Sequence, residues 1–378
     1  MIFFSPALRY QPGGYCAHSK FESRVAKTEF VLLRPPSLRY TVAMAHDSDT
    51  GDCNGSPLCL TVDSSSISKA AQLLAAGRLV AFPTETVYGL GGDARNAESV
   101  AAIFAAKDRP SFNPLISHVA DAEAAFALGQ KTPLAMVLAD AFWPGPLTLI
   151  LHRQADCQIA MLTSAGLDRI ALRVPAHEAA RALLREFGGP VAAPSANPSG
   201  RISPSRADHV VNGLGDRIDL VLDGGPCESG VESTVVDCSG DKAVILRPGG
   251  VTREQISAAL TKAGLTLVNN QADGSKQDMV SPGMMQSHYA PNCTLKMNVL
   301  TPSEGMELIG FGEVSGAGML ASTLSASGNL VEAAANLFDR LHAADATGAS
   351  VIGVAPIPTT GIGEAINDRL SRAAAPRS

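Results

Sequence analysis

The strongest constraint on the fold is an alternation of short apolar runs and helical segments that begins near residue 66. Residues 67–76 and 97–106 carry apolar side chains at helical spacing, and the first of these segments ends at Gly77. Mixed strands and helices predict an α/β fold, with a sheet whose loops gather at one edge. The predicted strands are 79–82, 115–119, 147–151, 170–174, 191–193, 220–223, 233–237 and 243–246.

The same pattern divides the chain into four parts. A polar stretch at 271–277 and the turn Ser281-Pro282-Gly283 indicate a linker. After the linker, strands at 308–312 and 351–354 alternate with helices at 330–341 and 364–373, which is typical of a small Rossmann-like domain. The expected parts are an N-terminal extension (1–65), a large α/β domain (66–265), a linker (266–295) and the small domain (296–378).

The first 43 residues differ in composition from the rest. They hold six Lys and Arg against two acidic residues, together with several aromatic residues and Pro35-Pro36. One interpretation is an organelle-targeting peptide. We favour the alternative of a disordered extension, or of translation starting at Met44, which predicts a cytoplasmic protein.

Composition excludes several classes of protein. The chain has 378 residues, of which 46% are hydrophobic, so it can form a full core without disulfides. A net charge of −6 argues against a general nucleic-acid coat protein. Seven cysteines without a C-x-x-C pair favour reduced thiols, and neither they nor the scattered histidines predict a metal site. No apolar run reaches the roughly 18 residues of a membrane span, so we expect no membrane contact.

Two cations stand at the end of the second predicted helix. Lys107 and Arg109 precede Pro110, which ends the helix, so both are expected on the loop that follows. They could simply be a solvated helix end, where the dipole favours basic residues. A third cation, Arg247, follows a predicted strand. Guanidinium forks and an ammonium together suit a polyphosphate.

Polar side chains also follow or interrupt the predicted strands. Ser195 and Asn197 come after the strand at 191–193, where open α/β sheets place ligands, although an ordinary turn before Pro198 would look the same. Ser233 enters a strand in the same way. Arg173 lies in an apolar strand, so it needs an anion, which is either a structural ion-pair partner or a substrate carboxylate. His118 also lies in a predicted strand, where a single histidine is more often a structural residue than a ligand-binding one.

A glycine-rich string at 89–94 fits G-x-G-x-x-A, with Asp108 further along. This resembles a dinucleotide fingerprint. We set it aside because residues 83–88 separate the preceding strand from the glycines, and because Asp108 follows a helix rather than a second strand. No P-loop and no G-x-S-x-G nucleophile elbow occur in the sequence.

Taken together, these strings resemble the long, two-domain form of the YrdC-like threonylcarbamoyl-adenylate synthase family. The similarity covers about four fifths of the chain and keeps the family's order. The strings are F-P-T-E-T-V-Y-G-L-G at 82–91, K-D-R-P-S-F-N-P-L at 107–115, W-P-G-P-L-T at 143–148, R-V-P at 173–175, P-S-A-N-P-S-G at 194–200, E-S-T-V-V-D at 232–237, R-P-G at 247–249, S-P-G-M at 281–284, H-Y-A-P at 288–291 and G-I-G-E-A-I-N-D-R-L at 361–370.

The resemblance implies a YrdC-like twisted mixed sheet with helices. It also implies a reaction that makes threonylcarbamoyl-adenylate and pyrophosphate from L-threonine, bicarbonate (or CO2) and ATP. Mg2+ is expected to accompany ATP. A partner enzyme then transfers the threonylcarbamoyl group to tRNA, and a contact with tRNA or double-stranded RNA is open. Lys107 and Arg109 are implied as catalytic. The residues implied to face ATP are Lys107, Arg109, Asn113, Asn197, Ser205 (or Ser203), Arg247, His288 and Tyr289, and those implied to face L-threonine are Thr84 or Thr86, His118, Arg173, Ser195 and Ser233.

Two other functions stay open from the sequence. One is a module that binds tRNA or double-stranded RNA without chemistry, whose affinity would fall steeply with salt. The other is a nicotinamide oxidoreductase, which depends on the glycine string. Consumption of ATP that depends on threonine and needs no RNA would decide for the synthase.

Overall fold

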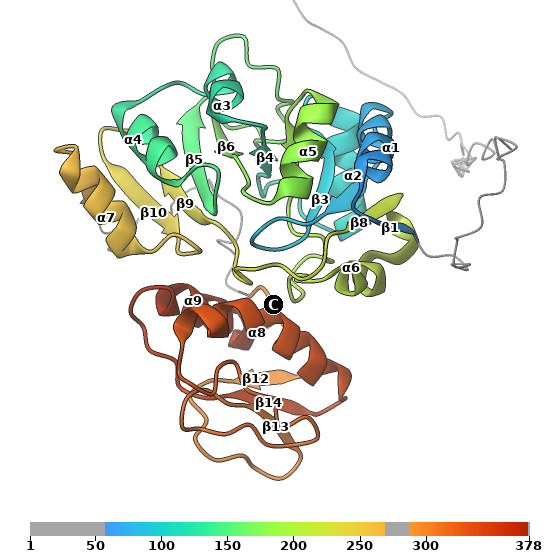
Figure 1. Ribbon diagram of the computed structural model, residues 1–378, viewed down its shortest axis with the longest axis vertical. Helices are drawn as coiled ribbons and strands as arrows, with labels where there is room; N and C mark the ends of the chain where they lie inside the picture. The colour runs from blue at the N-terminus through green and yellow to red at the C-terminus, as the bar shows by residue number, and fades with distance from the viewer. Residues whose placement is uncertain (1–56, 269–286, 377–378) are drawn as a thin grey trace, which may run out of the picture. The chain divides into compact units, whose positions relative to one another are not determined.

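The structure, a computed structural model, describes residues 57–268 and 287–376, which belong to one compact unit. Within these residues the larger domain is built on an eleven-stranded sheet with the order β1-β8-β2-β3-β7-β4-β6-β5-β9-β10-β11 (Figure 1). The strands are β1 (Leu58–Thr61), β2 (Val80–Phe82), β3 (Gly89–Asp93), β4 (Ile116–His118), β5 (Leu147–His152), β6 (Arg169–Arg173), β7 (Val191–Ala192), β8 (Leu220–Asp223), β9 (Thr234–Asp237), β10 (Ala243–Arg247) and β11 (Leu267–Val268).

The sheet is mixed, as the sequence predicts. For example, β4 runs parallel to β6 and antiparallel to β7, while β3 runs antiparallel to both β2 and β7. The glycine string forms β3, where a Cβ on Gly91 would lie 2.8 Å from the Phe82 ring and one on Gly92 would lie 2.6 Å from Ser99 Oγ. The glycines therefore allow close packing inside a strand. They do not form the strand-to-helix turn of a dinucleotide site.

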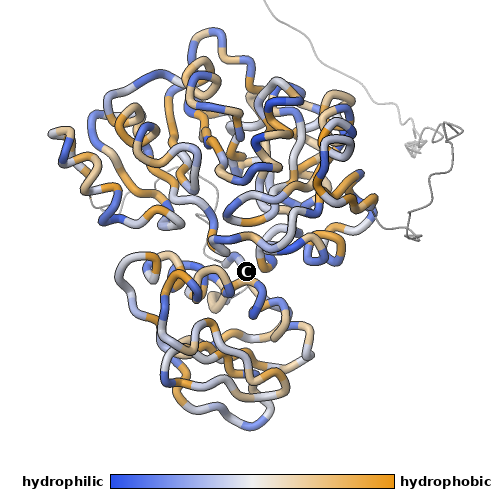
Figure 2. Tube along the Cα trace, in the orientation of Figure 1, coloured by the Kyte–Doolittle hydropathy of each residue, from blue (hydrophilic) through white to orange (hydrophobic). Residues whose placement is uncertain are grey.

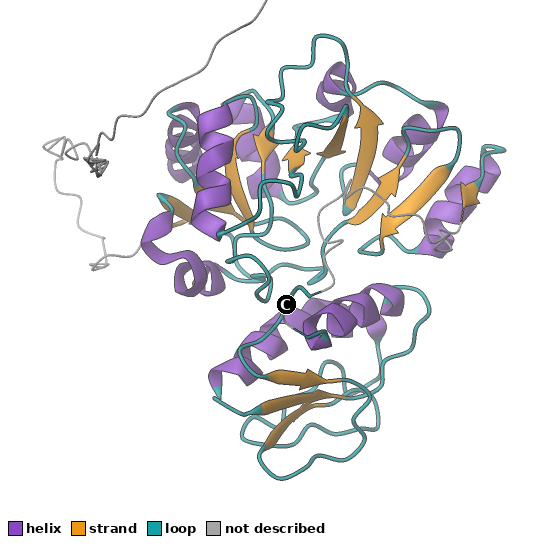
Figure 3. Ribbon diagram, turned by 180° about the vertical axis from the view of Figure 1, so that it is seen from behind, coloured by secondary structure: helices purple, strands orange, loops and turns teal. Residues whose placement is uncertain are grey.

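Helices flank this sheet (Figure 3). α1 and α5 pack against each other and share a core with β2, β7 and β8. Residues of α2, α4, α6 and α7 belong to a second core with other strands. The helices of this domain, with one 3-10 turn (η1, Gly215–Arg217), are α1 (Ser64–Ala75), α2 (Ala97–Lys107), α3 (Ala122–Leu128), α4 (Pro133–Phe142), α5 (Glu178–Phe187), α6 (Ala207–Leu214) and α7 (Arg253–Lys262).

The C-terminal domain has, in the described part of the chain, a parallel three-stranded sheet with the order β12-β14-β13. Its strands are β12 (Thr294–Lys296), β13 (Met306–Ile309) and β14 (Val351–Val354), and its helices are α8 (Leu330–Ala346) and α9 (Gly363–Ala374). Apolar residues recur along the helices and strands of both domains (Figure 2). The core of the small domain also includes Val87, Ile202 and Val231 of the larger one. The two domains therefore share a hydrophobic cluster.

The predicted helices and strands of the first domain are all present, with ends shifted by a few residues. β1 requires a correction, because it lies within the range 1–65 that the sequence assigned to an extension, yet it pairs with β8 along four residues. The residues of β1 alternate between half-buried and exposed positions, unlike the mostly buried strands that the sequence predicted. In the small domain the strand expected at 308–312 lies at Met306–Ile309 and ends before Gly310. The expected features at 1–43, 271–277 and 281–284 lie outside the described residues.

No helix among the described residues is both long and apolar enough to cross a bilayer.

Candidate active site

Lys107 is the last residue of α2, and its side chain is buried rather than solvated. Its Nζ donates to the backbone carbonyl of Ser195 at 2.5 Å and also to that of Asn197. Asp108 follows with a φ of 51°, in the left-handed conformation that ends the helix. The interpretation of Lys107 as a solvated helix end is therefore wrong. The two strings that the sequence singled out, around residues 107 and 195, meet directly.

Arg109 and Arg247 are the other cations of the site, and both are buried. Arg109 donates from Nη2 to the Pro114 carbonyl at 3.2 Å and from Nε to the Asn113 carbonyl at 3.4 Å. Arg247 donates from Nη2 to the Ser233 carbonyl at 2.9 Å and to Ser233 Oγ at 3.1 Å. These cations are thus held in place largely by neutral oxygen atoms.

Burial disfavours the charged forms of the three cations. Burial lowers the pKa of Lys107 well below its ordinary value, and the positive charge of Arg109 lowers it further. Burial also lowers the pKa of Arg109, to about 10, and the pKa of Arg247. Like charges held together in a low-dielectric interior favour the binding of an anion.

Arg173 forms a buried ion pair with a carboxylate. Its Nη2 lies 2.6 Å from Glu85 Oε1 and 3.0 Å from Thr86 Oγ1. The second oxygen of Glu85 accepts from the Ala176 N–H at 3.0 Å. Thr86 Oγ1 is in turn 2.8 Å from Thr84 Oγ1. Of the two interpretations of Arg173, the ion pair is present in the structure, and Glu85 is a residue that the sequence did not single out.

Most of the predicted site residues line one small, polar cavity of about 50 Å³. It is lined by residues in or next to β4, β6, β7, β9 and β10, and by the segment 288–289. Its lining residues are Thr86, Val87, Arg109, Ile116, His118, Arg173, Ala193, Pro194, Ser195, Glu232, Ser233, Arg247, His288 and Tyr289.

The remaining predicted residues surround this cavity at different distances. Lys107 and Asn197 are joined to its Ser195 edge through the ammonium contacts. Asn113 is buried behind Arg109, and its carbonyl accepts from that guanidinium. Ser205 is farther away, with its Oγ 3.4 Å from His209 Nδ1. The alternative, Ser203, donates to the Glu232 carboxylate at 2.6 Å instead.

Several buried polar atoms at the site have no hydrogen-bond partner among the described residues. They include Nδ1 of His118, Nδ1 of His288 and Oδ1 of Asn197. Buried polar groups are nearly always satisfied in native proteins. These three atoms therefore mark positions where a ligand could supply the missing partner, and two of them belong to residues that line the cavity.

His288 and Tyr289 form the wall on the linker side. The backbone of Tyr289 has a φ of 63°, and its ring packs against Phe338 and under the guanidinium of Arg369. Burial lowers the pKa of His288 to about 3, and the nearby cations add to the effect although Glu232 opposes it. His288 is therefore a neutral imidazole at physiological pH.

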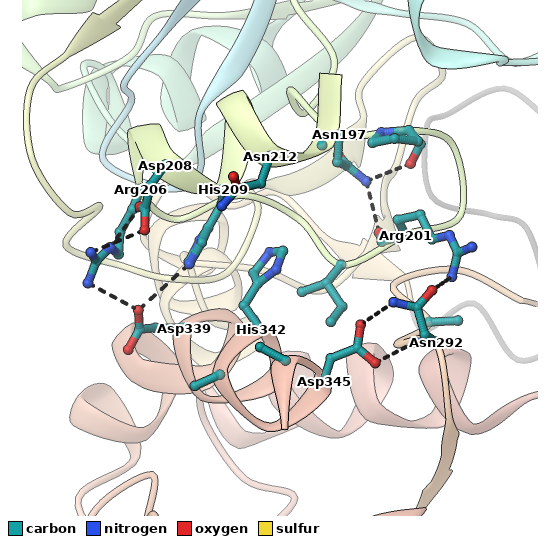
Figure 4. Close-up of a pocket in the computed structure, with 16 residues that line it drawn as sticks. Asn197, Arg201, Arg206, Asp208, His209, Asn212, Asn292, Asp339, His342 and Asp345 are labelled. Atoms are coloured by element: carbon teal, nitrogen blue, oxygen red, sulfur yellow. Dashed lines mark hydrogen bonds and ion pairs between the residues drawn. The ribbon is translucent and has the colours of Figure 1, made fainter. Parts of the chain in front are cut away.

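A second, larger cavity of about 670 Å³ lies between α6 and α8 and shares Asn197 with the site (Figure 4). The rings of His209 and His342 stack here, with centroids 3.9 Å apart. Asp339 lies near His209, and Asp345 accepts from Asn292 on the other side of the cavity.

The donor set does not favour a resident metal. Among residues 57–268 and 287–376, no group of three or more His, Cys, Asp or Glu side chains is placed to hold a metal ion. The two carboxylates of the site, Glu85 and Glu232, are each engaged by an arginine. Metal needed by the reaction would thus have to arrive with a substrate.

Comparisons with known proteins cover nearly all of the described chain. Residues 72–249 match the Sua5, YciO and YrdC family, described as "Telomere recombination", and residues 251–375 match "Threonylcarbamoyl-AMP synthase, C-terminal domain". A Bacillus subtilis protein named "Threonylcarbamoyl-AMP synthase" is 42% identical over 84% of this chain and 95% of its own length. A Pyrococcus abyssi protein of the same name is 39% identical over 80% of this chain and 92% of its own length. The solved structure "Crystal structure of P. abyssi Sua5 complexed with L-threonine" matches with a TM-score of 0.75, 36% identity, and coverage of 84% of this chain and 97% of that one.

Proposed function

The chain belongs to the Sua5/YrdC family of threonylcarbamoyl-AMP synthases, and from that membership we propose which of its residues hold each substrate. It forms L-threonylcarbamoyladenylate and pyrophosphate from L-threonine, bicarbonate and ATP, in the pathway that modifies tRNA. The observation that supports our assignment best is the group of buried cations at one cavity. Three buried basic side chains, each held in place by backbone carbonyls, suit a triphosphate.

The triphosphate is assigned to Lys107, Arg109 and Arg247. Each of these residues already makes backbone contacts that fix its side chain, so little reorganisation is needed when the anion binds. A guanidinium group is planar, so it can donate two parallel hydrogen bonds to one phosphate. Asn113, Asn197, Ser205, His288 and Tyr289 complete the ATP site in our proposal, with the unsatisfied Oδ1 of Asn197 as an acceptor for the nucleotide.

L-Threonine is assigned to the half of the cavity near β4, β6 and β9. The solved relative from P. abyssi was crystallised with L-threonine. Here Thr84, Thr86, His118, Arg173, Ser195 and Ser233 provide hydroxyl, imidazole and guanidinium groups around one space. Glu85 keeps Arg173 oriented, and Arg173 attracts the carboxylate of the amino acid.

The small volume of the cavity implies a change on binding. Ligand sites usually enclose about 300–1,000 Å³, whereas this cavity measures about 50 Å³. The side chains of His288 and Tyr289 line it and would have to move outward to admit ATP. We place the nucleoside end of ATP in the 670 Å³ cavity beyond Asn197, where His209 and His342 offer ring surfaces.

The chemistry follows from this arrangement. Bicarbonate takes up a proton and loses water to give CO2. The amine of threonine attacks CO2, an N–C bond forms and one proton leaves, which gives a carbamate. A carbamate oxygen then attacks the α-phosphorus, the bond to the bridging oxygen breaks, and pyrophosphate departs with the electron pair. The cations neutralise charge that develops on the phosphates, so positioning and electrostatics carry the catalysis. We assign no general base.

Three finer features belong to the same proposal. Mg2+ is expected to arrive bound to the phosphates of ATP, since the described residues form no metal cage. A tRNA-modifying threonylcarbamoyl transferase would take the product. We also propose a cytoplasmic location, in keeping with the reduced thiols of Cys157, Cys227 and Cys238, and leave direct contact with tRNA or double-stranded RNA to experiment.

The test is incubation of the protein with L-threonine, bicarbonate, Mg2+ and ATP, followed by mass analysis for the mixed anhydride. We expect a product that requires threonine and forms without RNA. L-Alanine in place of threonine is the matched control. Salt-sensitive RNA binding without any consumption of ATP would favour the RNA-binding module instead.

A further inference from the structure

Arg369 comes from α9 of the C-terminal domain, yet its side chain is fully buried beside the active-site loops. Its Nε lies 2.6 Å from Glu232 Oε2, and its Nη2 donates to the Pro248 carbonyl at 3.0 Å. The guanidinium carbon also lies 5.3 Å from the centre of the Tyr289 ring. One side chain of the small domain thus contacts three segments around the cavity.

Two of these segments behave as one structural unit. Glu232 precedes Ser233, and Pro248 follows Arg247. The two loops are joined by the bonds from Arg247 to the Ser233 carbonyl and by Gly250 N–H to the Glu232 carbonyl at 3.2 Å. Arg369 contacts both loops, each at the residue next to the one assigned to a substrate.

Glu232 carries a buried charge that Arg369 balances. Its Oε1 accepts from Ser203 Oγ and its Oε2 from Arg369 Nε, each at 2.6 Å. Burial raises the pKa of Glu232, but the charges of Arg369 and Arg247 outweigh it and lower the pKa to about 2. The carboxylate is therefore ionised, and it faces two arginines of which only Arg247 is assigned to ATP.

We propose that Arg369 is a positioning residue for the reaction, which holds the Glu232 carboxylate and the Pro248 carbonyl so that Ser233 and Arg247 are presented to the substrates. The inference rests on the assignment of Ser233 to threonine and of Arg247 to ATP. It gives the C-terminal domain a direct task at the active site. Without Arg369, the Glu232 carboxylate would pair with Arg247 and withdraw that guanidinium from the phosphates.

The test compares Arg369→Met, Arg369→Lys and the double variant Arg369→Met/Glu232→Gln in the full-length chain. We expect kcat/KM for ATP to fall about 100-fold for Arg369→Met, if the loss is like that of an oxyanion-hole donor. Lysine keeps the charge but cannot bind Glu232 Oε2 and the Pro248 carbonyl in the same geometry. We therefore expect kcat/KM for ATP to fall about tenfold for Arg369→Lys. The double variant no longer carries the Glu232 charge, but it still lacks the contacts through which Arg369 positions the loops. We therefore expect its kcat/KM for ATP to stay at least tenfold below that of the parent.

Glu364→Gln is the matched control, because Glu364 also belongs to α9 and forms an ion pair with Arg253 of the larger domain, away from the cavity lining. It should leave kcat/KM within twofold of the parent. Binding of α,β-methylene-ATP, measured by calorimetry, should weaken for the Arg369 variants and not for Glu364→Gln. A purely structural role predicts instead a lowered melting temperature with normal kinetics of the folded protein.

The outcomes separate this inference from the proposed function. If Arg247→Ala impairs the use of ATP while the folded Arg369 variants have kcat/KM within twofold of the parent, the positioning role is wrong. If Arg247→Ala has no effect, the assignment of the ATP site itself fails. Should Arg369→Met not fold, the lysine and double variants decide, since neither leaves Glu232 facing an apolar side chain as an unpaired charge.

Discussion

Lys107 is a fully buried ammonium group with no carboxylate ion-pair partner among the described residues. Its hydrogen bonds go to two backbone carbonyls, and Arg109 lies close enough to lower its pKa further. Such a group costs free energy in the unliganded protein. An anion bound beside Lys107 would favour its charged form, in keeping with the proposed triphosphate site.

Replacement of Lys107 by methionine should separate activity from stability. Methionine fills the space and removes the charge repulsion with Arg109, so the melting temperature should not fall greatly. We expect threonine-dependent release of pyrophosphate to drop by about 10²–10³. Lys262→Met is the matched control, since Lys262 is the exposed last residue of α7, and it should be fully active. Normal turnover by Lys107→Met would remove this residue from the site.

Arg173 and Glu85 form a buried ion pair, which predicts strong coupling between them. Removal of one partner leaves a buried charge, at a cost of about 3–5 kcal/mol of unfolding free energy. Glu85→Ala and Arg173→Met should therefore each destabilise the protein, and the double variant should recover part of the loss. Urea denaturation of the four proteins measures the coupling. Additive losses would show that the pair is not a unit.

The sequence singled out the cations, which the structure places close together, but not their partners. Lys107, Arg109 and Arg247 stand in short strings that a phosphate site would use, so they could be identified directly. Glu85 and Glu232 could not, because their significance depends on arginines 88 and 137 residues away in the chain. An ion pair between distant positions leaves no periodic or local signal in one sequence.

The predicted strands were found because most of them are short, largely apolar runs. The sequence pattern did not identify α3–α7, although α5 has Ala179, Ala180, Leu183 and Leu184 on one buried face. β3 was missed because three glycines and an aspartate in five residues are not typical of a strand, and only its close approach to β2 and α2 explains the glycines. Tertiary packing overrides local propensity at these places.

The contact between α6 and α8 should make stability depend on pH. Burial and the neighbouring His209 lower the pKa of His342 to about 4, although its bond to the Ser203 carbonyl and the charge of Asp208 oppose this effect. In the unfolded chain the imidazole titrates at about pH 6.5. The unfolded state therefore binds more protons between these values, and His342 should reduce stability as the pH falls through this window.

His342→Gln removes this contribution while it keeps a polar group near Ser203. We expect the unfolding free energy of the variant to fall less than that of the parent between about pH 6.5 and pH 4.5. Urea denaturation at several pH values measures the difference between the two proteins, so that carboxylates common to both cancel. Equal slopes for variant and parent would contradict the predicted contribution.

The candidate site lies beside contacts between the two domains. Val87, Ile202 and Val231 of the larger domain belong to the core of the smaller one, and they flank the loops of the site in sequence. Arg369 adds a polar contact to the same region. The sequence predicted two domains, but it gave no signal that the second one reaches the loops of the first, because that information lies in packing between distant segments.

Gly230 offers a direct test of this dependence. It has a φ of 62°, and a Cβ here would lie 2.2 Å from the Ala334 carbonyl in α8. Gly230→Ala should therefore push α8 away from the loop that leads to Glu232 and Ser233, and lower both the melting temperature and kcat/KM. Gly225→Ala is the control, since Gly225 has a φ of 81° and nothing within 4 Å of the added Cβ. It carries only the backbone strain of about 1 kcal/mol. A difference between the two variants thus measures the contact between the domains rather than the cost of a left-handed residue, and equal kinetics for both would show that the loops keep their geometry without α8.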